Sequence, residues 1–212
     1  MSDEREQRVE SGEAKVSVQS RASVLRRAAA VGGALSAGGL VVAAAVPGRA
    51  GSAPSPAQDV KIFDLVLLLE LLEESFYREA LKKGKLRGEL RQFARVVHAH
   101  ERAHVAFFRK VLGNKASAPP KFDFGDVTGD PDKFSATAAV LEDTGVAAYN
   151  GQAANLTKPS LAAAAKIVSV EARHAAWVRV IRGDDPAPRA TDQPMTAKQV
   201  MAAVRKTGFV QT

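Results

Sequence analysis

The four-residue pattern Glu-x-x-His occurs twice, each time inside a long apolar segment with helical spacing. Glu101 and His104 form the first copy, and Glu171 and His174 form the second. Residues three apart in an α-helix share a face and lie about one turn apart along the axis. Both pairs are expected to point into a helical core, because apolar residues share their faces: Phe93, Val97, Phe108 and Val111 in the first segment, and Ile167, Val170, Val178 and Ile181 in the second.

A second repeat lies in two other segments of the chain. Glu70 is followed by Tyr77, and Glu142 is followed at the same spacing by Tyr149. Seven residues bring a helix back to within about 20° of its starting angle, so each segment presents a carboxylate and a phenol on one side. Each such segment precedes one Glu-x-x-His segment. The region is therefore an internal repeat of two similar halves, each with a Glu/Tyr segment followed by a Glu-x-x-His segment.

Helix-breaking residues divide the region into four long segments, which predicts an all-α fold. The helices are expected at about residues 60–82, 89–112, 131–156 and 159–182. A short turn, a long connection over residues 114–131 and another short turn is the connectivity of two antiparallel helix hairpins packed as a four-helix bundle. No segment alternates apolar and polar residues for long enough to favour a β-strand.

The helix ends also carry capping residues. The predicted N-caps are Asp59, Asp130 and Thr157 for the first, third and fourth long helices, and Thr196 for a short C-terminal helix over residues 197–206. Proline follows closely at the third and fourth starts, where its fixed φ suits a first helical turn. The predicted organisation is a leader and flexible linker over 1–57, the bundle over 58–183, and a Pro-rich tail with the short helix over 184–212.

The first 57 residues have the pattern of an export signal. Arg26-Arg27 opens an uncharged segment of alanine and glycine, and a stretch of small residues follows up to Ala57. This composition favours a twin-arginine leader, although Ala28 and Ala29 replace the bulky apolar pair usual in that motif. The protein is therefore expected outside the cytoplasm, in the periplasm or envelope, with transient membrane or translocon contact through the leader. Cleavage is expected after Ala45, Ala50, Ala53 or Ala57; a retained anchor and an early start codon are the alternatives.

The composition excludes several kinds of site. The chain has no cysteine, which rules out a cysteine nucleophile, a thiolate zinc site and a cysteine-bound iron–sulfur cluster. The formal net charge of +7 favours solubility and an acidic partner without deciding either. No nucleic-acid partner is expected.

The predicted core collects four carboxylates that it cannot neutralise with lysine or arginine. Burying four like charges together is strongly unfavourable, so either protons or cations must accompany them. Two divalent cations balance the four negative charges, and two neutral imidazoles complete the ligand set. Carboxylate and imidazole suit iron, manganese or zinc, and one Glu from each of two helices plus Glu-x-x-His from the other two is a di-iron or di-manganese pattern.

Over about residues 60–182, the chain resembles the ferritin-like superfamily, and in detail bacterial ferritin-like domain proteins akin to the plant desiccation-related proteins. The matching stretches are LELLEESFY (69–77), HERAHV (100–105), LEDTGVAAY (141–149) and VEARH (170–174), with the 122–124 loop and Gly208-Phe209. The resemblance implies two divalent transition-metal ions, iron ahead of manganese, with Glu101 and Glu171 as bridging candidates. The implied ligands are Glu70, Glu101, His104, Glu142, Glu171 and His174.

Three neighbouring residues offer alternative ligands. Glu73 is an alternative to Glu70, but Gly145 takes its place in the other half. His98 and His100 are expected to be partly exposed or hydrogen-bonded and not to add a third imidazole ligand.

The remaining conspicuous side chains have simpler explanations. Tyr77 and Tyr149 are expected to hydrogen-bond a ligand or carry an electron, with core packing as the alternative. Trp177 is expected to pack. A stripe of arginines away from the Glu-x-x-His face is expected to be solvated, with a subunit contact or an acidic partner as the alternative: Arg91, Arg95, Arg102 and Arg109.

The expected function follows from the site and the leader. The leading hypothesis is an exported dinuclear-metal protein that oxidises Fe²⁺ or handles dioxygen or peroxide under stress. One rival is a manganese catalase-like dismutase. A rival of another class is a non-enzymatic envelope stress protein in which the metal only stabilises the fold. The simplest alternative is a bundle that binds no metal. A storage shell is less expected, and the sequence leaves monomer, dimer or larger homo-oligomer open.

Overall fold

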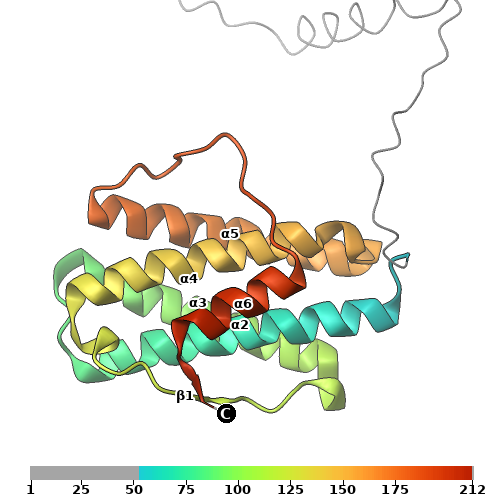
Figure 1. Cartoon of the computed structure of the whole chain (residues 1–212), viewed down its shortest axis with the longest axis horizontal. Coiled ribbons are helices and arrows are strands. Elements are labelled where there is room, and N and C mark those ends of the chain that lie inside the picture. Colours follow the sequence, from blue (N-terminus) through green and yellow to red (C-terminus); the bar gives the residue numbers. More distant parts are fainter. Residues whose placement is uncertain (1–52, 212) are drawn as a thin grey trace, which may run out of the picture. The chain divides into compact units, whose positions relative to one another are not determined.

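A computed structural model describes residues 53–211. The helices within them are α2 (Pro56–Lys83), α3 (Gly88–Leu112), α4 (Pro131–Gln152), α5 (Lys158–Arg182) and α6 (Ala197–Thr207). The main contacts are α2 with α3 and α4 with α5, and a long connection runs beneath α2 from the end of α3 to the start of α4 (Figure 1). This arrangement confirms the all-α, four-helix bundle with a short C-terminal helix. The predicted leader lies almost wholly outside the described residues.

The start of α2 differs from the prediction. Ser55 is the N-cap and accepts a hydrogen bond from the amide of Gln58 at 3.2 Å, so α2 begins at Pro56. Asp59 lies within the first turn and instead reaches the start of α5. There its carboxylate accepts hydrogen bonds from the amide of Thr157 at 2.9 Å, from the Thr157 hydroxyl at 2.5 Å and from the Ser160 hydroxyl at 2.7 Å.

Thr157 is the N-cap of α5 by position, but its side chain does not cap its own helix. The Thr157 hydroxyl donates its hydrogen bond to Asp59, so the prediction that the Thr157 side chain caps α5 is wrong. The carboxylate of Asp59, on α2, stabilises the start of α5 instead. It accepts a hydrogen bond from the Thr157 amide, which has no partner within α5, and it places negative charge at the positive end of the helix dipole. Asp130, in contrast, caps α4 as predicted, accepting from the amides of Asp132 and Lys133 at 2.9 and 3.0 Å.

The C-terminal segment is tied to the bundle at both ends. The amide of Met195 donates to the carbonyl of Ala147 in α4 at 2.9 Å, and a Cβ added at Gly151 would overlap the Met195 backbone. Thr196 then caps α6 through a reciprocal capping box with Gln199. After α6, strand β2 (Val210–Gln211) pairs antiparallel with β1 (Lys121–Phe122) in the long connection, a two-residue pairing that the sequence did not predict.

Two apolar clusters fill the two ends of the bundle. One joins the C-terminal half of α2 to the N-terminal halves of α3 and α4, and it includes Phe76, Phe93, Phe134 and the closing Phe209. The other joins the opposite halves of these helices around Phe108. A layer of buried carboxylates and histidines lies between them.

The predicted inward faces are largely correct. Phe93, Val97, Phe108 and Val178 are fully buried. Val170 and Ile181 are only partly buried, and Val111 has 52% of its surface exposed. Leu112, one residue on, takes the buried position at the end of α3. Among the described residues, none of the helices is long and apolar enough to cross a membrane.

Candidate metal centre

The six predicted ligands come together in the middle of the bundle. Each long helix contributes: α2 gives Glu70, α4 gives Glu142, and α3 and α5 each give a glutamate and a histidine from one Glu-x-x-His. The four glutamate residues are almost completely buried, with no more than 1% of the surface of any of them exposed. They sit where the sequence periodicity predicted, on the inward face of each helix.

The ligand atoms form two groups, each centred on one imidazole. Nδ1 of His104 lies 3.2 Å from Oε2 of Glu70, 3.2 Å from Oε2 of Glu101 and 3.0 Å from Oε1 of Glu171. We call this group the His104 subsite. Within it, one potential ligand atom from each of the four residues lies within 4.8 Å of all the others.

The second group mirrors the first. Nδ1 of His174 lies 3.2 Å from Oε1 of Glu101, 3.3 Å from Oε2 of Glu142 and 3.5 Å from Oε2 of Glu171. We call this group the His174 subsite. Glu101 and Glu171 belong to both subsites, and each gives one oxygen to one subsite and the other oxygen to the second. This is the arrangement that bridging carboxylates need.

The donor atoms fit two cations. In the described structure, five buried atoms of this cluster have no hydrogen-bond partner: Oε1 of Glu101, Oε2 of Glu142, both carboxylate oxygens of Glu171, and Nδ1 of His174. Buried polar atoms without a partner are rare in folded proteins, because each costs its full desolvation free energy. Lone pairs of carboxylate and imidazole converging on one space are suited to iron or manganese.

Two tyrosines donate hydrogen bonds across the bundle to Glu70 and Glu142, the two glutamates that belong to only one subsite each. The Tyr149 hydroxyl, on α4, donates to Oε1 of Glu70 on α2 at 2.6 Å. The Tyr77 hydroxyl, on α2, donates to Oε1 of Glu142 on α4. In each case the other oxygen, Oε2, is the one that faces the subsite. The predicted hydrogen bond between a tyrosine and a ligand carboxylate is therefore present twice.

The pKa values of the two histidines show that protons accompany the buried carboxylates when no metal is bound. Burial by itself lowers the pKa of His104, but the nearby carboxylates of Glu101, Glu171 and Glu70 reverse this and raise that pKa to about 12. The pKa of His174 is likewise raised to about 12, by Glu101, Glu142 and Glu171 against the effect of burial. Both imidazoles then carry a proton and a positive charge at neutral pH.

The carboxylates divide into two kinds. Burial and the neighbouring carboxylates Glu171 and Glu70 raise the pKa of Glu101 well above its usual range. Burial raises the pKa of Glu142 as well, to about 7, although His174 opposes the shift. Burial acts in the same sense on Glu171, but His104 and His174 outweigh it and lower its pKa to about 2. Metal binding must displace these protons from the ligands.

Glu73 is buried beside the centre but belongs to neither subsite. Burial raises its pKa well above the usual range, and the nearby carboxylates of Glu142 and Glu101 raise it further. A Cβ added at Gly145 would lie 3.6 Å from Oε1 of Glu73, so the glycine in the other half leaves room for this side chain. Glu70, and not Glu73, therefore lies in a subsite, and its role as the first-helix ligand stays a prediction.

The other histidines of α3 are hydrogen-bonded, as predicted. Nε2 of His98 lies 3.2 Å from Oε1 of Glu74, outside the centre. Nδ1 of His100 lies 2.8 Å from Nε2 of His174, and the two rings lie end to end and nearly coplanar, with centroids 5.1 Å apart and 18° between their planes. Burial, with the nearby positive charge of His174, lowers the pKa of His100. The sequence gives no signal for this partner, which depends on how α3 packs against α5.

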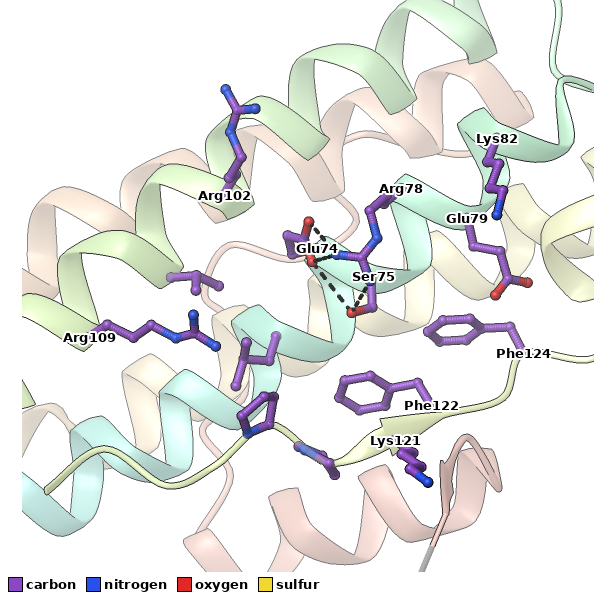
Figure 2. Close-up of a pocket in the computed structure, with 14 residues that line it drawn as sticks. Glu74, Ser75, Arg78, Glu79, Lys82, Arg102, Arg109, Lys121, Phe122 and Phe124 are labelled. Atoms are coloured by element: carbon purple, nitrogen blue, oxygen red, sulfur yellow. Dashed lines mark hydrogen bonds and ion pairs between the residues drawn. The ribbon is translucent and has the colours of Figure 1, made fainter. Parts of the chain in front are cut away.

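Two cavities lie on different faces of the bundle. A pocket of about 410 Å³ between α3 and α5 is lined by His104 and His174 of the centre and by His100. A larger one of about 890 Å³ lies between α2, α3 and the long connection, and none of the six candidate ligands lines it (Figure 2). Arg102 and Arg109 of the predicted arginine stripe border this larger cavity, and all four arginines of the stripe are exposed.

The chain was compared with curated protein sequences and with models of protein families. No curated protein sequence matches the chain significantly. The family described as the ferritin-like domain matches residues 58–184, which covers more than half of the chain and all six residues of the buried cluster. The chain therefore belongs to the ferritin-like domain family.

Proposed function

We propose that the protein is an exported dinuclear-metal protein, with iron ahead of manganese, that oxidises Fe²⁺ or consumes dioxygen or peroxide during stress. One observation carries this proposal. Glu101 and Glu171 each give one oxygen to the His104 subsite and one to the His174 subsite. A lone structural ion would need only one such subsite, whereas two adjacent redox-active ions supply two electrons to one oxidant.

The chain's own residues would hold the ions and shape their surroundings. The tyrosine hydrogen bonds keep Glu70 and Glu142 oriented with Oε2 toward the subsites. The aromatic clusters at both ends of the bundle exclude bulk water, which strengthens electrostatic interactions in the centre. Glu73 lies beside the centre and faces Gly145, and burial raises its pKa well above the usual range.

The proposed oxidation balances without a further reductant. Two Fe²⁺ give up one electron each, and one O₂ accepts these two electrons and two protons to leave as H₂O₂. With peroxide as the oxidant, two Fe²⁺, one H₂O₂ and two protons give two Fe³⁺ and two water molecules. Fe²⁺ is the substrate in both reactions.

The test is anaerobic titration of the full chain with Fe²⁺, followed by exposure to O₂ or H₂O₂. We expect about two ions per chain and oxidation of Fe²⁺ faster than in buffer. Glu101→Gln keeps the shape of the side chain but removes a bridging carboxylate, so it should abolish the two-ion stoichiometry. Glu73→Gln is the matched control and should preserve it.

The outcomes separate the rival functions. O₂ evolution from H₂O₂ by the Mn²⁺-loaded protein, without Fe²⁺ oxidation, would favour the catalase-like dismutase. Tight binding of metal without either reaction would favour the non-enzymatic stress protein. Failure of the unaltered chain to bind Fe²⁺ or Mn²⁺ would refute the metal centre. Export through the leader and kinship with desiccation-related proteins rest on the sequence patterns and are part of this proposal.

A further inference from the structure

The two subsites have the same ligand types but unequal surroundings. The His104 side chain is 11% exposed, whereas the His174 side chain is 3% exposed. Both imidazoles face their subsite through Nδ1, which leaves Nε2 of each ring for a partner outside the subsite.

Nε2 of His174 has a partner, and Nε2 of His104 has none among the described residues. Nε2 of His174 is paired with Nδ1 of His100 at 2.8 Å, and the two rings are nearly coplanar, with 18° between their planes. When His174 offers the lone pair of Nδ1 to a metal, its proton is on Nε2. His174 is then the donor and His100 the acceptor.

The internal repeat does not reproduce this contact. The residue before the first Glu-x-x-His is His100, and the residue before the second is Val170. A valine cannot accept a hydrogen bond, so the imidazole of His104 lacks the support that the imidazole of His174 receives. Val170 instead lines the pocket of about 410 Å³ between α3 and α5, which both imidazoles border and in which His104 is the more exposed of the two.

We propose that His100 makes the two metal subsites unequal: it positions His174 as a tightly held ligand, while the His104 subsite, whose imidazole is the more exposed in the pocket between α3 and α5, exchanges its ion through that pocket. This inference rests on the proposed dinuclear centre and adds the order and route of exchange. A hydrogen bond to the far nitrogen of a ligating imidazole fixes its orientation and raises its basicity. Loss of such a partner typically weakens metal affinity about 10–100-fold.

The experiment measures release of Co²⁺ from the fully loaded chain into excess chelator, followed by absorbance. The unaltered protein should release its ions in two phases, one ion in each. His104→Ala should remove the fast phase and keep the slow one, which assigns the fast phase to the His104 subsite. His174→Ala should keep the fast phase.

His100→Val copies the residue of the other half and should speed the slow phase about 10–100-fold, toward the fast one. His100→Asn should restore slow release, because its side-chain oxygen can replace Nδ1 as the acceptor. His98→Ala is the matched control, since His98 is on the same helix but bonds Glu74, and it should leave both phases unchanged.

The route has its own test. Ala103→Phe places a ring in the pocket and should slow the fast phase without changing the number of ions. Ala106→Phe adds the same ring at an exposed position of α3 that does not line this pocket and should have no effect.

The results distinguish this inference from the function on which it rests. Release of two ions in a single phase, or two phases unchanged in His100→Val, overturns the inference and leaves the dinuclear centre standing. An effect of His100→Val that His100→Asn does not rescue also overturns the positioning role. Failure of the unaltered chain to bind Co²⁺ overturns both.

Discussion

The hydroxyl of Tyr149 donates a 2.6 Å hydrogen bond to Oε1 of Glu70, so the second half of the bundle orients a carboxylate of the first. Tyr77 does the same for Glu142 in the opposite direction. The two helix hairpins are therefore joined in their buried centre by a reciprocal pair of hydrogen bonds. Neither half of the internal repeat completes its own ligand set without the other.

This reciprocity predicts that the two tyrosines act on different subsites. Tyr149→Phe should weaken metal binding mainly at the His104 subsite, which contains Glu70, and Tyr77→Phe mainly at the His174 subsite, which contains Glu142. Each change should cost about 10–100-fold in affinity, because the carboxylate loses the partner that orients it. Co²⁺ titration by calorimetry measures the two steps, and each variant is the control for the other. Weakening of the same step by both changes would contradict the assignment.

Periodicity predicted which six side chains lie on the inward faces, because each helix orients its own side chains; that these residues are metal ligands is implied by the family resemblance and stays a prediction. Glu101 and His104 share a face wherever α3 lies, and the surrounding apolar residues determine that this face is buried. The bundle followed from the same pattern together with the connection lengths. Asp130 illustrates the local signals, since it caps the helix that begins one residue later.

Contacts between helices could not be predicted because they depend on how the helices are aligned. Asp59 is in the first turn of α2, and nothing near it in sequence shows that the start of α5 lies beside it. The pairing of His100 with His174 and the docking of Met195 on Gly151 have the same origin. Such contacts join residues far apart in sequence, so helical periodicity gives no information about them.

Asp59 should contribute to stability through the hydrogen bonds at the start of α5. Asp59→Ala removes the acceptor for the Thr157 amide, and loss of such a cap costs about 1–2 kcal/mol in the free energy of unfolding. Burial opposes ionisation, but hydrogen bonds from Thr157 and Ser160 lower the pKa of Asp59 below 3.8. Its stabilisation is present above that pH and is lost as the pH falls through the folded pKa.

Urea unfolding of Asp59→Ala and of the unaltered chain at pH 7 and pH 3 measures this contribution. The difference should shrink at the lower pH. Asp192→Ala, at an exposed position outside the helices, is the control and should change neither value. An equal loss at both pH values would show that the ionised carboxylate is not what stabilises α5.

Two glycines of α4 should respond in opposite directions to the same substitution. At Gly151 a methyl group would overlap the Met195 backbone, so Gly151→Ala should displace the segment before α6 and destabilise the protein by about 1–3 kcal/mol. At Gly145 the nearest atom is 3.6 Å away and the backbone is helical, so Gly145→Ala should stabilise the helix by up to about 1 kcal/mol. Thermal unfolding of both variants provides the comparison. Stabilisation by Gly151→Ala would contradict the docking.

The leader hypothesis predicts a mature chain that starts within residues 46–58. Cleavage after Ala45, Ala50 or Ala53 leaves the Ser55 cap of α2 in place, whereas cleavage after Ala57 removes it. N-terminal sequencing of exported protein should therefore give Val46, Gly51 or Pro54 as the first residue. Replacement of Arg26-Arg27 by two lysines should block a twin-arginine route, with Arg21→Lys as the control. A mature protein that begins near residue 1 would refute the leader.

The metal-free and metal-loaded forms should differ in how their stability depends on pH. In the metal-free chain, five buried groups have a raised folded pKa: Glu73, Glu101, Glu142, His104 and His174. The folded state therefore holds more protons than the unfolded state from about pH 4.5 upward, so the free energy of unfolding should fall as pH rises from 5 to 8. Each extra proton contributes a slope of about 1.4 kcal/mol per pH unit. Glu171 has the opposite shift, to about 2, and changes its contribution only below this window.

Metal loading should reverse that slope. Protons compete with the ions for the same carboxylates and imidazoles, so binding strengthens as pH rises. Stabilisation of about 3–4 kcal/mol is expected at neutral pH when the free ion is at 100–1,000 times its dissociation constant. Unfolding curves from pH 5 to 8, with chelator and with Mn²⁺, make the comparison, and Glu101→Gln should remove the effect of Mn²⁺. Parallel pH dependences without stabilisation would mean that protons on the buried histidines and glutamates alone offset the charge of the cluster and that the bundle carries no metal.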